Sequence, residues 1–204
     1  MPEKIKALLL LGPTGAGKTP LGEELEKRSF LNRKAHHFDF GALLRKIASG
    51  EIPFLTEEKF LIQTILKEGR LLKEEEFYLA EKILLYYLAY KKYQPEDWLV
   101  LNGLPRNLYQ AKQLERLANI RYVVHLNIDF STLKLRLRFD PAGDRKERED
   151  DIEELVEYKL TWFKKETFPL LDYYQQRARI INLPVKERDS GEDLFIKLSQ
   201  MLEM

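Results

Sequence analysis

A glycine-rich segment near the amino terminus contains the residues whose types and spacing most clearly indicate chemistry. Residues 12–19 read Gly-Pro-Thr-Gly-Ala-Gly-Lys-Thr and fill every fixed position of the phosphate-binding pattern G-x-x-x-x-G-K-[ST]. Glycines let the backbone turn its N–H groups inward around an anion, and a following helix adds partial positive charge. We therefore expect a nucleotide phosphate site formed by Gly12, Gly15, Ala16, Gly17, Lys18 and Thr19.

The two polar residues that close this segment have separate expected roles. The Lys18 ammonium would bridge the β- and γ-phosphates, and the Thr19 hydroxyl would bind Mg²⁺. A glycine-rich turn that arose by chance is the competing interpretation. The flanking residues argue against it, because an apolar strand is expected at 5–11 and a helix from Pro20 onward, where proline suits the first turn.

Length and composition limit the architecture and the partners. A chain of 204 residues can form one sizeable α/β domain, and a net charge of +1 gives no signal for nucleic acid or membrane partners. Cysteine is absent, which excludes disulfide chemistry and is compatible with a reducing cytosol. The first apolar run enters the phosphate loop directly, unlike a signal peptide, and no apolar run approaches the ~20 residues that span a bilayer. We expect a cytoplasmic monomer.

The elements that must position the loop alternate along the chain. Continuous apolar runs predict buried strands, and the helical patterns between them predict a parallel sheet covered on both faces. The expected strands are 5–11, 35–38, 98–102, 122–128 and 179–183. The expected helices are 20–28, 41–49, 56–68, 73–93, 108–117, 131–138, 151–177 and 192–202.

Motifs downstream of the loop follow one another in the order of the nucleoside monophosphate kinases, and of adenylate kinases in particular. H-F-D-F-G-A-L-L-R at 37–45 resembles that family's H-I-S-T-G-D-L-L-R, and G-R-L-L-K at 69–73 resembles G-K-L-V-P. N-G-L-P-R at 102–106, with Gln110 following, resembles D-G-F-P-R and its glutamine. R-E-D-D at 148–151 resembles the R-x-D-D that ends the lid. The resemblance covers nearly the whole chain.

This resemblance implies a fold and its division into parts. It implies a three-layer αβα fold of the P-loop NTPase class, in which one domain of 1–204 contains a five-stranded parallel sheet. A helical subdomain that binds the nucleoside monophosphate would lie near 39–72. A short lid would lie near 139–150, with no room for an inserted zinc-binding or β-rich lid.

The resemblance also implies phosphoryl transfer from ATP, with Mg²⁺, to a nucleoside monophosphate, with AMP as the expected acceptor. Little covalent work is left to the protein in such a transfer, so arginines that bind phosphate oxygens supply most of the catalysis. Lys18, Arg45, Arg106, Arg138 and Arg148 are the expected catalytic residues, with Arg145 as a further candidate. Arg45 and Arg106 would also hold the acceptor's phosphate, while Phe40, Leu71, Leu72 and Gln110 would contact its base.

Four residues depart from the family pattern. Asn102 replaces an acid that helps to organise the water shell of Mg²⁺, and Asp39 is a candidate replacement that would act through water. Asp39 as a turn or helix-cap residue is an equally open interpretation. Phe40 and Ala42 replace a small hydroxyl residue and an acid near the acceptor base. Lys159 replaces an arginine and keeps the charge without the bidentate fork.

These departures keep two other functions open. One is a kinase of another small molecule on the same fold, with Asp39 as the base toward a hydroxyl group. The other is a nucleotide-binding regulatory protein with weak or lost catalysis, which Asn102 and Lys159 suggest. A GTPase is disfavoured, because the sequence lacks an N-K-x-D run for guanine recognition.

Overall fold

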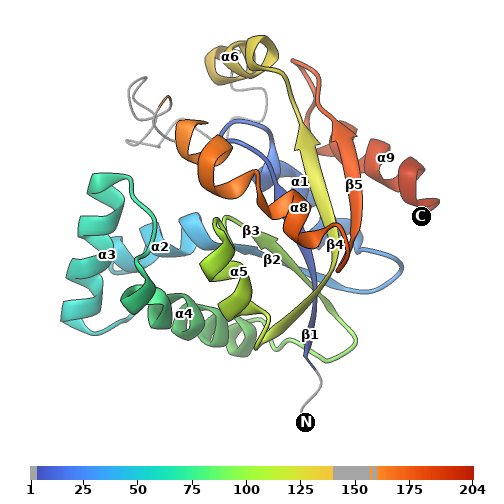
Figure 1. The fold of residues 1–204 in the computed structure, drawn as a ribbon. Coiled ribbons are helices and arrows are strands. Elements are labelled where there is room, and N and C mark those ends of the chain that lie inside the picture. The colour runs from blue at the N-terminus through green and yellow to red at the C-terminus, as the bar shows by residue number, and fades with distance from the viewer. Residues whose placement is uncertain (1–3, 140–156, 158–159) are drawn as a thin grey trace.

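A five-stranded parallel sheet forms the centre of the protein (Figure 1). The structure is a computed structural model, and it describes residues 4–139, 157 and 160–204. The strand order is β2-β3-β1-β4-β5, so β1 is central and its carboxyl end leads into the phosphate loop. The strands are β1 (Ile5–Leu11), β2 (Ala35–Asp39), β3 (Trp98–Asn102), β4 (Ala118–Asn127) and β5 (Arg179–Pro184). The predicted fold class is confirmed.

Helices cover both faces of this sheet. The helices are α1 (Lys18–Arg28), α2 (Phe40–Ser49), α3 (Thr56–Glu68), α4 (Phe77–Tyr90), α5 (Leu108–Leu114), α6 (Phe130–Phe139), α8 (Leu170–Tyr174) and α9 (Gly191–Leu202). A 3₁₀ helix at Glu74–Glu76 precedes α4, and a π-helix at Phe163–Thr167 precedes α8. Figure 1 shows α5 and α8 in front of the sheet and α1 behind it.

The central strand explains why two layers of helices are needed. Successive side chains of a strand point to opposite faces, and from Ala7 to Leu11 every side chain of β1 is buried. Leu8 and Leu10 pack in a cluster with residues of α1 and α9, whereas Ala7, Leu9 and Leu11 pack with residues of α2 to α5 and α8. A strand that is apolar on both faces requires cover on both.

Two elements begin four residues away from their expected starts. β4 begins at Ala118 rather than 122, because Ala118 and Ile120 are buried beside β1 while the polar residues between and after them face solvent. The helix expected at 73–93 is a 3₁₀ turn followed by α4. Glu76 fixes that turn, since its carboxylate accepts the Lys73 N–H at 2.8 Å.

The long helix expected at 151–177 is helical at 157 and 160–162 but interrupted further along its described part. The chain forms the π-helix Phe163–Thr167, a turn, and then the short helix α8. Pro169 has no N–H to bond a carbonyl four residues back, and the Phe168 N–H instead bonds the Phe163 carbonyl five residues back, at 2.7 Å. The proline therefore converts a regular pattern into a π-turn.

A close contact between α1 and β2 leads to a test of packing. A Cβ added at Gly22 would lie 2.3 Å from the ring atoms Cδ2 and Nε2 of His37, which is itself buried. We expect Gly22→Ala to lower the free energy of unfolding by about 1–3 kcal/mol, because the ring or the helix must shift. Urea denaturation followed by circular dichroism measures this change.

Gly41→Ala is the matched control for that substitution. Its added Cβ would meet nothing closer than 3.5 Å, and Gly41 also lies in a helix. Equal stability losses in the two variants would contradict the packing explanation.

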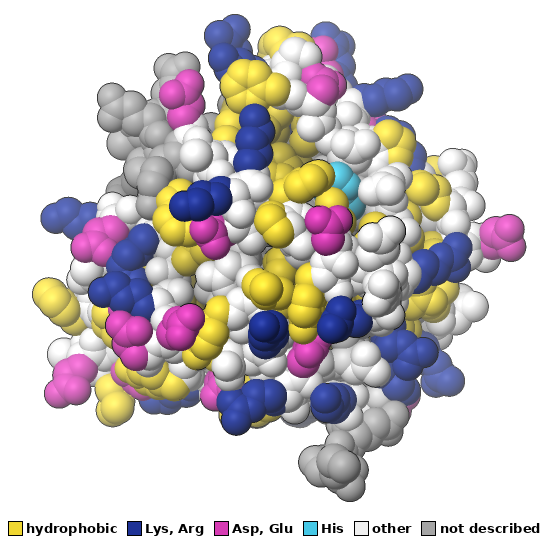
Figure 2. Space-filling model, viewed as in Figure 1, with side chains coloured by type: hydrophobic (Ala, Val, Ile, Leu, Met, Phe, Trp, Pro, Cys, Tyr) yellow, Lys and Arg dark blue, Asp and Glu magenta, His cyan; other side chains and the backbone are white. Residues whose placement is uncertain are grey.

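The surface of the protein carries mixed charge. Figure 2 shows lysines and arginines interspersed with aspartates and glutamates over the visible face. This agrees with the net charge of +1. Among the helices that the structure describes, none has the length and apolar character needed to cross a membrane.

Candidate active site

A single cleft at the carboxyl edge of the sheet brings together most of the predicted site residues. The phosphate loop follows β1, Asp39 ends β2 and Asn102 ends β3, so parallel strands place all three at one edge. Predicted residues that line the cleft are Gly12, Gly15, Gly17, Lys18, Thr19, Asp39, Phe40, Arg45, Leu71, Leu72, Arg106 and Gln110. Segments far apart in sequence therefore share one cavity.

The phosphate loop has the backbone that its glycines predict. Gly15 and Gly17 have φ of 84° and 99°, in the left-handed region that favours glycine. The Ala16 side chain is buried beneath the loop, where it packs with the α1 side of the core. The Lys18 Nζ lies over the loop, donating to the carbonyl oxygens of Gly12 and Pro13 at 2.7 Å each. The ammonium is thus held at the place where phosphates would enter.

Thr19, Asp39 and Asn102 form a polar cluster beside the loop. The Thr19 hydroxyl donates to Asp39 Oδ2 at 2.7 Å, and the Asn102 amide donates to the same oxygen at 2.9 Å. Burial opposes ionisation of Asp39, but the hydrogen bonds from Thr19 and the Ala42 N–H, with the charges around it, hold its pKa below the ordinary value. The carboxylate is therefore ionised at neutral pH.

The donor set of this cluster fits a hard divalent cation. Mg²⁺ is held in nucleotide sites by few protein oxygens together with phosphates and water. A hydroxyl and an ionised carboxylate beside the phosphate loop supply that chemistry. Within the described residues there is no group of three His, Cys, Asp or Glu side chains that would hold a metal without the nucleotide.

Arg106 lies on the acceptor side of the cleft and is fixed through its backbone. Its N–H donates to Gln110 Oε1 at 2.8 Å, and its carbonyl accepts the Thr167 hydroxyl at 2.7 Å. The Arg106 Nε donates to the Gly103 carbonyl at 2.9 Å, and Arg45 lines the same cleft from α2. Two guanidinium groups from separate elements can therefore converge on one anion.

The other wall of the cleft is apolar. Phe40 is 4% exposed and stacks on Phe38, with ring centroids 6.0 Å apart. Leu71 and Leu72 face the same space, in a turn that a bidentate Arg70–Glu76 ion pair stabilises at 2.7 and 2.9 Å. A flat, mostly apolar ligand part such as a base suits this wall.

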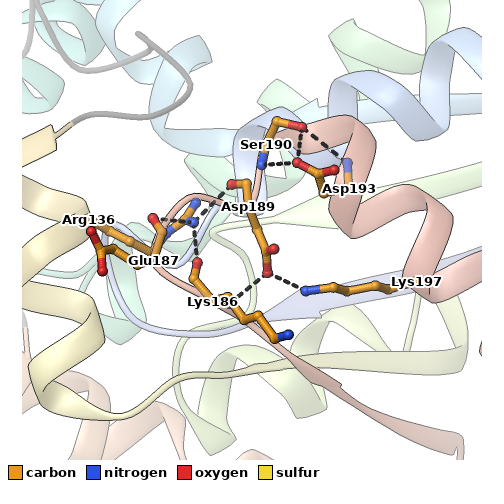
Figure 3. A network of polar contacts seen from close by, with 7 residues as sticks. All are labelled: Arg136, Lys186, Glu187, Asp189, Ser190, Asp193 and Lys197. Carbon is orange, nitrogen blue, oxygen red and sulfur yellow. Dashed lines mark hydrogen bonds and ion pairs between the residues drawn. The ribbon is translucent and has the colours of Figure 1, made fainter.

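Sequence reasoning missed Arg136, which lines the cleft from α6. Figure 3 shows its contacts with the loop that precedes α9. Arg136 is 2% exposed and donates to carbonyl oxygens of the loop between β5 and α9, at 2.8 Å to Lys186 and 2.9 Å to Asp189. Its Nε donates to the Gly15 carbonyl at 3.2 Å. The helical spacing offered a signal, because Arg136 lies three residues after the buried Leu133. Arg136 thus connects α6 to the phosphate loop.

The structure brings none of the predicted lid arginines that it describes into the cleft lining. Arg138 is exposed near the end of α6 and is not among the described residues that line the cleft, so its catalytic role stays a prediction. Arg145, Arg148 and Lys159 lie outside the described residues, as does nearly all of the predicted lid. Trp162, Phe163 and Thr167, which lie within the helix expected at 151–177, line the cleft from the segment around the π-helix.

Comparison with known proteins assigns the family. A family model for adenylate kinase matches residues 10–179, which include every described residue that lines the cleft. The chain belongs to the adenylate kinase family. Adenylate kinase of Prochlorococcus marinus (strain MIT 9211) is 30% identical over 184 residues, covering 86% of this chain and 87% of that protein. Adenylate kinase of Rickettsia prowazekii (strain Madrid E) is 27% identical over 217 residues, covering 92% and 96%.

A solved structure supports the fold alone. Shikimate kinase from Bacteroides thetaiotaomicron superposes with a TM-score of 0.50 at 21% identity, covering 98% of this chain and 99% of that one. Membership of the adenylate kinase family makes the chain a nucleoside monophosphate kinase. Members of the family use ATP as its Mg²⁺ complex, and the Thr19 and Asp39 oxygens fit that metal.

Proposed function

We propose that this nucleoside monophosphate kinase uses ATP as donor and AMP as acceptor, and forms two molecules of ADP. The observation that carries the proposal is the single cleft in which the phosphate loop faces Arg45, Arg106 and Gln110. A nucleotide on the loop and a second one against the arginines would meet with their phosphates between them. A reaction between two nucleotides uses both halves of this cleft.

The chemistry requires positioning and positive charge more than acid–base groups. An ionised oxygen of the acceptor's phosphate attacks the γ-phosphorus of the donor, and the bond from that phosphorus to the bridging β,γ-oxygen breaks. The electron pair of this bond stays on the ADP that leaves. Lys18 would neutralise the transferring group, and Arg45 and Arg106 would orient the acceptor phosphate. Arg138 and Arg148 are proposed to add charge from the lid.

The geometry gives less support to Asp39 as a base toward a hydroxyl acceptor. Its Oδ1 accepts the Ala42 N–H at 2.8 Å, and its Oδ2 accepts from both Thr19 and Asn102. These bonds hold the pKa of the carboxyl below its ordinary value, which makes it a weak proton acceptor. A phosphate acceptor needs no such base.

Turnover with a panel of acceptors tests the proposal. The purified protein is assayed with MgATP and AMP, CMP, UMP or GMP, and ADP formation is followed by a coupled assay. We expect the highest kcat/KM with AMP. Phosphorylation of none of the four above a Lys18→Ala control would refute the proposal and favour a regulatory nucleotide-binding protein.

Gln110 leads to a test of acceptor recognition. Its Oε1 accepts the Arg106 N–H at 2.8 Å, so its amide NH₂ is the end that remains for a base, and adenine offers a ring nitrogen as acceptor. Gln110→Glu keeps the bond to Arg106 but replaces the donor with an acceptor. We expect KM for AMP to rise about 10-fold or more, as an unpaired buried polar group costs ~1–3 kcal/mol. Steady-state kinetics measure it, and an unchanged KM would remove Gln110 from the base site.

A further inference from the structure

Asp39 and Asn102 are register partners at the carboxyl ends of two adjacent parallel strands. The pairing of β2 with β3 places Asp39 opposite Asn102. The family pattern that this chain resembles has an acid at the end of β3, where this chain has Asn102. The acid of this chain stands one strand away, at the same level of the sheet.

The contacts of Asp39 reach the group expected to bind the metal. Its Oδ2 accepts the Thr19 hydroxyl at 2.7 Å, so the Thr19 oxygen has one lone pair for the Asn102 amide and one for a cation. The Asn102 Nδ2 lies 2.9 Å from the same Asp39 oxygen and 3.1 Å from Thr19 Oγ1. Asp39 therefore supplies the negative charge next to Thr19, and Asn102 donates hydrogen bonds to both.

The neutral amide at position 102 is the partner that a transposed acid requires. Asn102 is 4% exposed, and a carboxylate there would face the Asp39 carboxylate at hydrogen-bonding distance in a buried site. The third neighbour is His37, whose Nε2 lies 3.3 Å from the Asn102 Nδ2. With one carboxylate and one amide, the two side chains form a hydrogen bond instead of repelling each other.

We propose that Asp39 is the positioning carboxylate for the Mg²⁺ of the donor nucleotide, transposed from β3 to β2, with Asn102 as its neutral partner. The inference rests on the proposed function only in requiring a donor nucleotide that binds with Mg²⁺. It does not depend on which acceptor is phosphorylated.

A purely structural role for Asp39 predicts a different outcome. Asp39 is the N-cap of α2, since its Oδ1 accepts the Ala42 N–H at 2.8 Å. Asparagine caps helices about as well as aspartate, so Asp39→Asn keeps the cap and removes only the charge. The substitution therefore separates the two roles.

The experiment measures how Mg²⁺ changes nucleotide affinity. The Kd of a non-hydrolysable ATP analogue is determined by calorimetry with and without Mg²⁺ for wild type, Asp39→Asn and the swap Asp39→Asn/Asn102→Asp. We take the ratio of the Kd without Mg²⁺ to the Kd with Mg²⁺. By linkage, this ratio equals the factor by which the protein raises the affinity of the nucleotide for the metal. We expect Asp39→Asn to reduce this ratio about 10-fold or more. The swap should restore it to within a few-fold of wild type.

Asp129→Asn is the matched control, because Asp129 accepts the Thr132 N–H at 2.9 Å in the same kind of cap and lies outside the cleft lining. A wild-type ratio in Asp39→Asn would overturn the proposal. The proposal would also be overturned if the double variant Asp39→Asn/Asn102→Asp had a wild-type melting temperature but the same low ratio of Kd values as Asp39→Asn. Failure of the proposed function is a separate result, since it would appear as absent phosphoryl transfer in the wild type.

Discussion

Lys18→Met is expected to lower kcat by about 10²- to 10³-fold, the loss typical of removing one group that stabilises transition-state charge. Methionine keeps the length and apolar stem of the side chain and removes the ammonium. In the structure that ammonium lies 2.7 Å from two loop carbonyls, at the mouth of the phosphate site. Steady-state kinetics with MgATP and AMP measure the effect, and calorimetry with an ATP analogue reports any loss of binding.

Lys27→Met is the control for that variant. Lys27 lies on the same helix, and its side chain is 69% exposed and pairs with Glu24 at 3.4 Å. We expect near wild-type turnover, because an exposed ion pair of this kind contributes little. Comparable rates in the two variants would mean that the loop does not hold the transferring phosphate.

Arg106→Leu is expected to reduce kcat/KM for the acceptor by about 10²- to 10³-fold while leaving donor affinity within a few-fold of wild type. The side chain faces the acceptor half of the cleft, and its backbone is bonded to Gln110 and Thr167 independently of the guanidinium. Arg106→Lys should recover only part of the loss, because lysine lacks the bidentate fork. Acceptor kinetics and donor calorimetry together separate the two halves of the cleft.

Arg116→Leu provides the comparison for Arg106. Arg116 is an exposed arginine that donates to Gln113 at 2.8 Å, outside the cleft lining. Its removal should change neither kcat/KM for the acceptor nor the affinity for the donor. If Arg106→Leu weakened donor binding and left kcat/KM for the acceptor unchanged, the assignment of the donor and acceptor to the two halves of the cleft would have to be reversed.

Features encoded by local pattern were predictable from the sequence. The apolar run before Gly12 and the glycines at φ 84° and 99° specify a buried strand and an anion loop through steric and burial rules. The sheet, its parallel direction and the grouping of Arg45, Arg106 and Gln110 at one edge follow from such patterns together with the family resemblance.

Features that depend on contacts between distant segments were not predictable. Arg136 lies at helical spacing from the buried Leu133, but its burial depends on carbonyls of residues 186–189 that no local pattern connects to it. The bond from the Thr167 hydroxyl to the Arg106 carbonyl likewise spans 61 positions. The hydrogen bond of Thr19 to Asp39 needed the register of the sheet to be known.

The contacts of Arg136 also constrain the order in which the protein can fold. The phosphate loop is synthesised early, but Arg136 connects Gly15 to the loop that precedes α9, and α9 packs against α1. At the start of α9, a Cβ added to Gly191 would lie 2.5 Å from the Pro20 carbonyl, so the two helices touch there. On the ribosome, the phosphate loop is therefore completed by residues that are made much later than the loop itself, and nascent chains that lack α9 should not retain nucleotide.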